Sequence, residues 1–128
     1  MIERIGTGSP WEPVVGYARV VRSGPHVWVS GCTATDAEGN VLGQTPGEQA
    51  EHALAGLVDA LARVRADPSD VVRTRIYVTD ISRWEEVAGA HGAVFADVLP
   101  AATMVEVSAL IDPRMLVEIE ADAFVAGD

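Results

Sequence analysis

A strictly alternating segment near the end of the chain constrains the fold more than any other feature. In residues 116–125 apolar side chains occupy every odd position, and the acids Glu118, Glu120 and Asp122 occupy even positions between them. Alternation with a period of two is typical of a β-strand that packs one face against a core. The segment therefore predicts a strand with one buried face and one acidic face.

A weaker alternation in residues 103–109 precedes this strand, and the dipeptide Asp112-Pro113 between the two segments favours a turn. The two segments predict an antiparallel hairpin in which Glu106 joins the acidic face. Like charges on neighbouring strands repel, so cations are needed nearby. Arg73 and Arg75 share one face of the predicted strand 71–79, which we therefore place in the same sheet.

Two segments predict helices. Thr45 and Glu48 form a capping box, and apolar residues then recur at spacings of three and four through residues 50–64. Ser82 and Glu85 suggest a second capping box, which opens a helix that ends before Pro100.

The remaining segments complete an α+β pattern. Residues 2–5, 17–21 and 26–34 predict strands, the last two joined as a hairpin, and residues 36–47 predict a surface loop. The order of elements predicts a single domain over residues 1–128, with a mixed sheet and two helices on one of its faces. The acidic face stays uncovered in such a domain, which predicts an oligomer.

Charge and composition exclude several classes of partner. The net charge is −10 and lysine is absent, which argues against nucleic-acid binding. No apolar run approaches the roughly 20 residues that span a bilayer, so we expect no membrane association. The single cysteine suggests a cytoplasmic protein. The acids Glu106, Glu118 and Glu120 lack His or Asp at ligand spacing, so we expect no metal and no cofactor.

Several short motifs are shared with a known family. They are Gly16-Tyr17, the Val-Ser-Gly of residues 29–31, residues 75–81, Pro100-Ala101 followed by the Val-Glu-Val of residues 105–107, Asp112-Pro113, and residues 117–121. Together they resemble the reactive-intermediate deaminase family, also called Rid, YjgF-like or L-PSP endoribonuclease-like proteins. The resemblance covers nearly the whole chain. It implies a chorismate-mutase-like fold and a homotrimer whose sheets face inward, with small-molecule clefts between subunits.

The resemblance also implies a site. Tyr17, Ser30, Gly31 and Glu120 match positions that line the cleft in deaminating members. There an acid and an ordered water are thought to hydrolyse an imine or enamine. We therefore expect Glu120, Ser30 and Tyr17 to be catalytic and Gly31 to contact the substrate. On the residues alone, Glu120 is as well explained by an ion pair with Arg73 or Arg75 at a subunit interface.

The chain departs from the family where the substrate carboxylate is held. Ala102 stands at the position of the clamping arginine, and Ala88 stands where asparagine is usual. A cleft lined by Ala102, Thr103 and Met104 would favour a neutral, more apolar substrate. If a clamp exists, Arg19 and Arg114 are the first suspects.

Two further residues are candidates for the cleft, and each also has a purely structural explanation. Cys32 lies two residues after Ser30, so it is expected on the same side of the sheet, facing the cleft as a substrate contact or a nucleophile, although a free cysteine is more often a small buried apolar residue. His91 is a candidate for proton transfer near the cleft or a partly buried interface residue.

The sequence is compatible with three functions. The first is hydrolytic deamination, or a related water addition, on a small molecule without a carboxylate. The second is a non-catalytic trimer that binds a metabolite or a partner, which Ala102 favours. An endoribonuclease ranks last because the chain is acidic.

Overall fold

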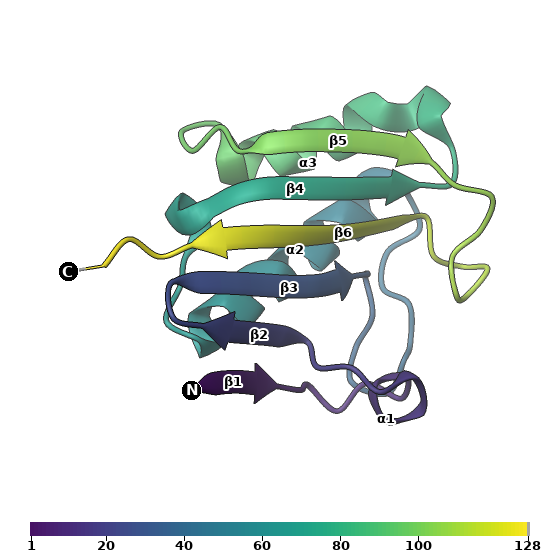
Figure 1. The fold of residues 1–128 in the computed structure, drawn as a ribbon. Helices are drawn as coiled ribbons and strands as arrows, with labels where there is room; N and C mark the ends of the chain where they lie inside the picture. Colours follow the sequence, from purple (N-terminus) through teal and green to yellow (C-terminus); the bar gives the residue numbers. More distant parts are fainter. Residues whose placement is uncertain (128) are drawn as a thin grey trace.

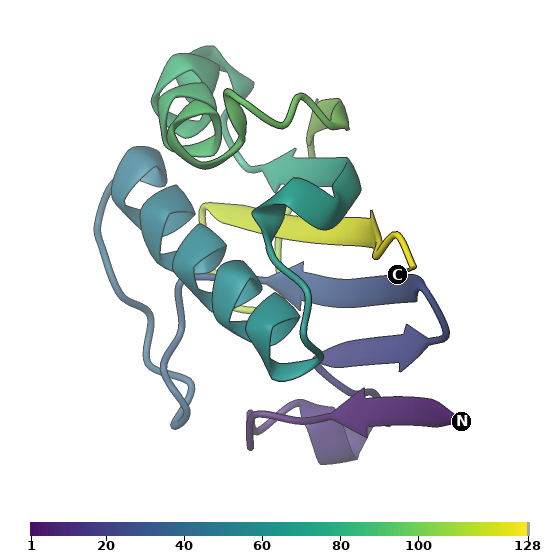
Figure 2. The ribbon, with the colours of Figure 1, turned by 90° about the vertical axis from the view of Figure 1, so that its left-hand side faces the viewer.

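Six strands form one mixed sheet, and two long helices cover one of its faces (Figures 1 and 2). The computed structural model describes residues 1–127. The strands are β1 (Ile2–Ile5), β2 (Val20–Ser23), β3 (His26–Cys32), β4 (Val71–Val78), β5 (Ala101–Glu106) and β6 (Val117–Phe124). The helices are α1 (Glu12–Val15), α2 (Pro46–Arg63) and α3 (Trp84–Phe95), and two 3₁₀ turns are η1 (Pro68–Asp70) and η2 (Ile81–Arg83). The predicted α+β class with two helices on one face is confirmed.

The strand order corrects one prediction. The order is β1-β2-β3-β6-β4-β5, so β6 lies between β3 and β4 and does not pair with β5. Strand β5 is an edge strand that runs parallel to β4 (Figure 1). A strand that returns to the sheet through a helix, as β5 does after α3, lies parallel to the strand before that helix. The predicted hairpin between residues 103–109 and 116–125 is therefore wrong.

The strand order also changes the position assigned to Glu106. It lies on the edge strand β5, and its carboxylate accepts a hydrogen bond from the backbone N–H of Ile81 at 3.0 Å. It is therefore not part of an acidic ladder with Glu118 and Glu120.

The alternation of β6 is realised as predicted. The odd-numbered residues face α2 and are at most 4% exposed: Val117, Ile119, Ala121 and Ala123. From α2, the buried side chains of Leu54, Leu57 and Leu61 join the same core. Burying such side chains stabilises the fold by roughly 1.5–3 kcal/mol each. The core therefore fills the space between the sheet and the two helices.

The two predicted capping boxes have different outcomes. Thr45 accepts from the N–H of Glu48, whose carboxylate accepts in turn from the N–H of Thr45, so the box on α2 is confirmed. The box on Ser82 is wrong, because Asp80 caps this segment instead. Its carboxylate accepts from the N–H and hydroxyl of Ser82 and opens the turn η2.

The uncovered face of the sheet carries the predicted charge compensation. Arg75 on β4 lies 3.4 Å from Glu120 and 3.2 Å from Asp122 on β6. Tyr77 donates its hydroxyl hydrogen to Glu120 at 2.7 Å. These groups are half-buried within a single chain. The placement of 71–79 beside the acidic strand is therefore confirmed.

Over residues 1–127, none of the helices combines the length and apolarity needed to cross a membrane.

Candidate functional site

A register shift in β3 shapes the site. The pairing of β3 with β6 shifts between Val29 and Cys32. The hydroxyl of Ser30 donates to the carbonyl of Ala18 at 2.7 Å, which anchors the irregular segment on the residues before β2. A bulge of this kind changes which side chains share a face of the sheet.

The bulge overturns the expected place of Cys32. Beyond the shift Cys32 pairs with Ile119, which belongs to the core, and it is only 4% exposed. Burial raises the pKa of its thiol. Since the thiolate is the nucleophilic form, this environment makes Cys32 less reactive. The prediction that it shares Ser30's side of the sheet is wrong.

A hollow of about 320 Å³ opens beside the bulge. Its polar lining is Tyr17, Arg19, Ser30, Gly31 and Glu118, together with Ser9, Thr33 and Thr35, and its apolar lining is Trp11, Val15 and Ile111. These residues come from the segment around α1, from the residues between α1 and β2, from β3 and the segment after it, from β6 and from the loop before β6. We call this hollow the bulge pocket. It brings together Tyr17, Ser30 and Gly31, three of the residues predicted from the sequence.

Glu118 supplies the acid of the bulge pocket. Its carboxylate lies over Gly31, and a Cβ atom at position 31 would collide with it. A side chain at position 31 would therefore displace the carboxylate of Glu118 from this position. Burial raises the pKa of Glu118, the neighbouring Glu120 raises it further, and Arg19 opposes both effects. A carboxyl with a raised pKa in a pocket is a candidate for proton transfer.

Glu120, which we predicted beside Tyr17 and Ser30, does not line the bulge pocket. It is held on the open sheet face by Arg75 and Tyr77. The alternative reading of Glu120 as the partner of Arg75 therefore describes its contacts, although the pair forms within one chain. Both acids lie on the same face of β6, so alternation alone did not distinguish them. The glycine at position 31 leaves room for a side chain above it, but it did not indicate which acid occupies that room.

Arg19 is the second pocket residue whose contacts the sequence did not reveal. One guanidinium nitrogen, Nη1, donates to the carbonyls of Gly31 at 2.6 Å and Ser30 at 3.3 Å. The other, Nη2, donates to the hydroxyl of Tyr17 at 3.3 Å. Arg19 therefore ties the bulge and Tyr17 together. Arg114, the other suspected clamp, is exposed and paired with Asp112, whose pKa it lowers to about 2.

The predicted residues of β5 lie away from the bulge pocket. Strands β6 and β4 separate β5 from β3. Ala102 and Thr103 are exposed, and Met104 packs partly against the core. One chain by itself therefore does not bring these three residues to Tyr17 and Ser30.

His91 lies on the covered face of the sheet. Its Nε2 atom is 2.9 Å from the hydroxyl of Thr74, and its ring centroid is 4.7 Å from that of Phe95. Neither contact belongs to the bulge pocket. The contacts of His91 are thus those of a partly buried packing residue.

The burial of His91 gives an expected pH dependence. Burial lowers the pKa of His91, so the unfolded chain binds more protons as the pH falls through the usual histidine pKa of about 6.5. The free energy of unfolding should therefore fall between about pH 7.5 and pH 5.5, and less so in His91→Gln. Urea unfolding of both proteins at the two pH values measures this. Equal pH slopes would contradict it.

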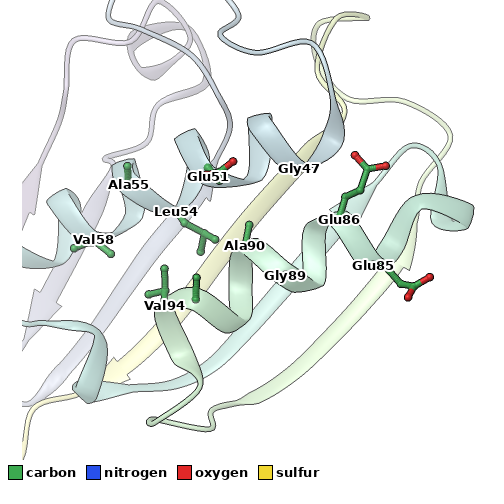
Figure 3. Close-up of a pocket in the computed structure, with 11 residues that line it drawn as sticks. Gly47, Glu51, Leu54, Ala55, Val58, Glu85, Glu86, Gly89, Ala90 and Val94 are labelled. Carbon is green, nitrogen blue, oxygen red and sulfur yellow. The ribbon is translucent and has the colours of Figure 1, made fainter.

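A larger hollow, of about 770 Å³, lies between α2 and α3 (Figure 3). Leu54, Val58, Ala90 and Val94 form an apolar floor, and Glu51, Glu85 and Glu86 add acids to its lining (Figure 3). None of the site residues predicted from the sequence lines it. In residues 1–127 no group of three or more His, Cys, Asp and Glu side chains is arranged to hold a metal ion. The bulge pocket is therefore the better candidate for chemistry.

The fold and the bulge pocket define a member of a known class. A family model described as Endoribonuclease L-PSP matches residues 7–125, and the chain belongs to this family, also called the YjgF or Rid family. The resemblance stated from the sequence motifs is thereby confirmed.

Individual relatives agree with this assignment. The crystal structure of Rv2704 from Mycobacterium tuberculosis, a member of the YjgF/YER057c/UK114 family, has a TM-score of 0.91 and 47% identity, and covers 98% of this chain and 100% of that chain. The RutC family protein y4sK from Sinorhizobium fredii is 34% identical over 124 residues, or 94% of this chain and 96% of its own. The protein SCO2049 from Streptomyces coelicolor is 34% identical over 123 residues, or 96% of this chain and 92% of its own.

Proposed function

We propose that the protein hydrolyses an imine or enamine that carries no carboxylate, releasing ammonia and a carbonyl compound. The observation that carries this proposal is the protonatable carboxyl of Glu118, which lies over Gly31 in the same pocket as the hydroxyl of Tyr17. Glu118 would take a proton from water as the oxygen adds to the C=N carbon, and return a proton to the departing nitrogen. The reaction would take place in the cytoplasm.

The arrangement of Tyr17 and Ser30 supports this role for Glu118. The hydroxyl of Tyr17 is oriented by Arg19, and Ser30 is anchored by its hydrogen bond to the carbonyl of Ala18. A preorganised polar wall of this kind holds a substrate in one orientation. Tyr17 and Ser30 are therefore proposed to position the substrate beside Glu118.

Ala102 and the contacts of Arg19 are the reasons for proposing a substrate without a carboxylate. Ala102 has no cationic group, and the guanidinium of Arg19 already donates to three protein oxygens. A buried carboxylate without a cation or hydrogen-bond donors is costly. We therefore propose a neutral or cationic substrate with an apolar flank against Trp11 and Ile111.

A matched pair of imines tests the proposed activity. A flavin amine oxidase forms an imine from 2-phenylethylamine, and an amino-acid oxidase forms the corresponding 2-imino acid from phenylalanine. We expect the protein to accelerate ammonia release from the first imine and not from the second. Acceleration of neither imine would reject this activity for the phenyl series and favour the non-catalytic alternative.

That alternative is a trimer that binds a metabolite or partner protein without chemistry. The loss of the arginine at position 102 favours it, since binding energy for the family's usual substrate is lost with that residue. Although the family model carries the name of an endoribonuclease, the net charge of −10 opposes contact with a phosphate backbone.

We also propose that the protein is a homotrimer, with the bulge pocket opening into a cleft between subunits. The exposed edge strand β5 and the open sheet face support this, because a second copy is needed to bring Ala102, Thr103 and Met104 to Tyr17 and Ser30. Closed symmetric oligomers of one chain are the common form of assembly.

Light scattering should report three times the mass of the chain. Arg75→Glu should lower the trimeric fraction, because it removes the cation between Glu120 and Asp122 and adds a like charge. Arg63→Glu, which changes an exposed arginine on α2, is the matched control and should leave the mass unchanged. A monomeric wild type at micromolar concentration would reject the trimer and its clefts.

A further inference from the structure

The charge of Arg19 is offset by a second buried group, Glu12. Glu12 on α1 is 8% exposed, and its carboxylate lies 4.0 Å from Nη2 of Arg19. The carboxylate is held in place by the hydroxyl of Thr7 at 2.8 Å and by the N–H of Thr7 at 3.1 Å. A Cβ atom at Gly6 would come within 2.6 Å of the same carboxylate. The loop before α1 is thus built around an acid that faces the arginine.

Three hydrogen bonds of Arg19 also go to oxygen atoms of the protein. Nη1 donates to two backbone carbonyls of the bulge, and Nη2 donates to Tyr17. The side chain of Arg19 is only 12% exposed. An arginine clamps a carboxylate through two free, parallel N–H groups. Since Nη1 is engaged by the backbone of the bulge, the fork that Nη1 and Nη2 would form together is not free for a ligand.

Glu118 is therefore the acid in the bulge pocket whose negative charge is not matched by a cation in an ion pair. Among the lining residues Arg19 is the single cation, and its guanidinium forms an ion pair with Glu12 at 4.0 Å. At short range in a partly buried site, charges select ligands strongly. With Arg19 offset by Glu12, an ionised Glu118 leaves the pocket with negative character.

We propose that Glu12 determines the charge specificity of this pocket: by offsetting Arg19, it makes the pocket select cationic ligands, namely protonated imines and amines with an apolar flank. The inference deepens the proposed function, on which it rests for the choice of imines. A protonated imine is also the form that water attacks most readily, because its carbon is the more electrophilic. Trp11 and Ile111 supply the apolar wall for the flank. Glu12 itself acts through Arg19 and is a positioning residue.

Binding of two matched probes tests this without any turnover. The probes are 2-phenylethylamine, a cation at pH 7, and 3-phenylpropanoate, an anion of similar size, and calorimetry measures both dissociation constants. Wild type should bind the amine at least about tenfold more tightly than the carboxylate. Glu12→Gln should tighten carboxylate binding by about tenfold or more, because Arg19 is then left with an unbalanced charge. The double variant Glu12→Gln, Arg19→Gln should lose that gain, which a merely structural role of Glu12 would not produce.

A second variant keeps the inference testable if Glu12→Gln unfolds the loop. Glu118→Gln leaves the Glu12 and Arg19 pair intact and should weaken amine binding by about tenfold. Wild-type binding of the carboxylate as tight as that of the amine would overturn the inference, as would an unchanged ratio in a folded Glu12→Gln. Amine selectivity without imine hydrolysis would reject the proposed catalysis alone, and hydrolysis without amine selectivity would reject the role of Glu12 alone.

Discussion

Glu118→Gln should lower the rate of hydrolysis of the imine from 2-phenylethylamine by about 10²–10⁴-fold, the usual contribution of a positioned acid–base group. Glutamine keeps the shape of the side chain over Gly31 but neither takes up nor releases a proton in this pH range. The measurement is initial-rate ammonia release at pH 7 with saturating oxidase, after subtraction of the uncatalysed rate. The pH profile of the wild type should show one group that titrates above the usual glutamate pKa, since burial and Glu120 raise the pKa of Glu118.

Glu120→Gln is the matched control, because it makes the same change two residues along β6. Glu120 is engaged by Arg75 and Tyr77 outside the bulge pocket, so hydrolysis should stay within about tenfold of wild type. A loss confined to Glu120→Gln, in a protein that remains assembled, would show that the acid is the one first suggested by the sequence motif. Equal losses of hydrolysis rate in both variants would show that the rate depends on the total negative charge of β6 and not on Glu118 alone.

Ala102→Arg should create turnover of small 2-imino acids that the wild type leaves unaccelerated. A bidentate arginine restores the group that holds a substrate carboxylate, an interaction of roughly 2–5 kcal/mol in buried pairs. We expect the rate with the 2-imino acid of 2-aminobutanoate to rise by about 10²-fold or more over the uncatalysed rate. Ammonia release from the oxidase-generated imine measures it.

Two controls accompany this variant. Ala102→Met adds length without charge and should produce no gain. Ala102→Arg combined with Glu118→Gln should lose the new activity, because the clamp binds but the acid is absent. If the wild type already hydrolyses small 2-imino acids, another residue supplies the clamp, with Arg19 and Arg114 the first to change.

Local patterns were sufficient to predict several elements. The alternation in β6 placed Val117, Ile119, Ala121 and Ala123 in the core, and the box of Thr45 and Glu48 marked the start of α2. Such predictions succeed because a strand's two faces and a helix's first turn depend on residues a few positions apart. Family motifs added the identity of Tyr17, Ser30 and Gly31 as neighbours in one pocket.

The sequence by itself determined the two long helices and the positions of most strands, the covered and uncovered faces of β6, the surplus of negative charge and the absence of an arginine at position 102. Only the tertiary structure decided that β6 lies between β3 and β4, that the bulge turns Cys32 into the core, and that Glu118 stands over Gly31 while Glu120 pairs with Arg75. A period of two assigns a side chain to a face but not to a neighbour. The neighbour depends on strand order and register, which are set by contacts between residues far apart in the chain.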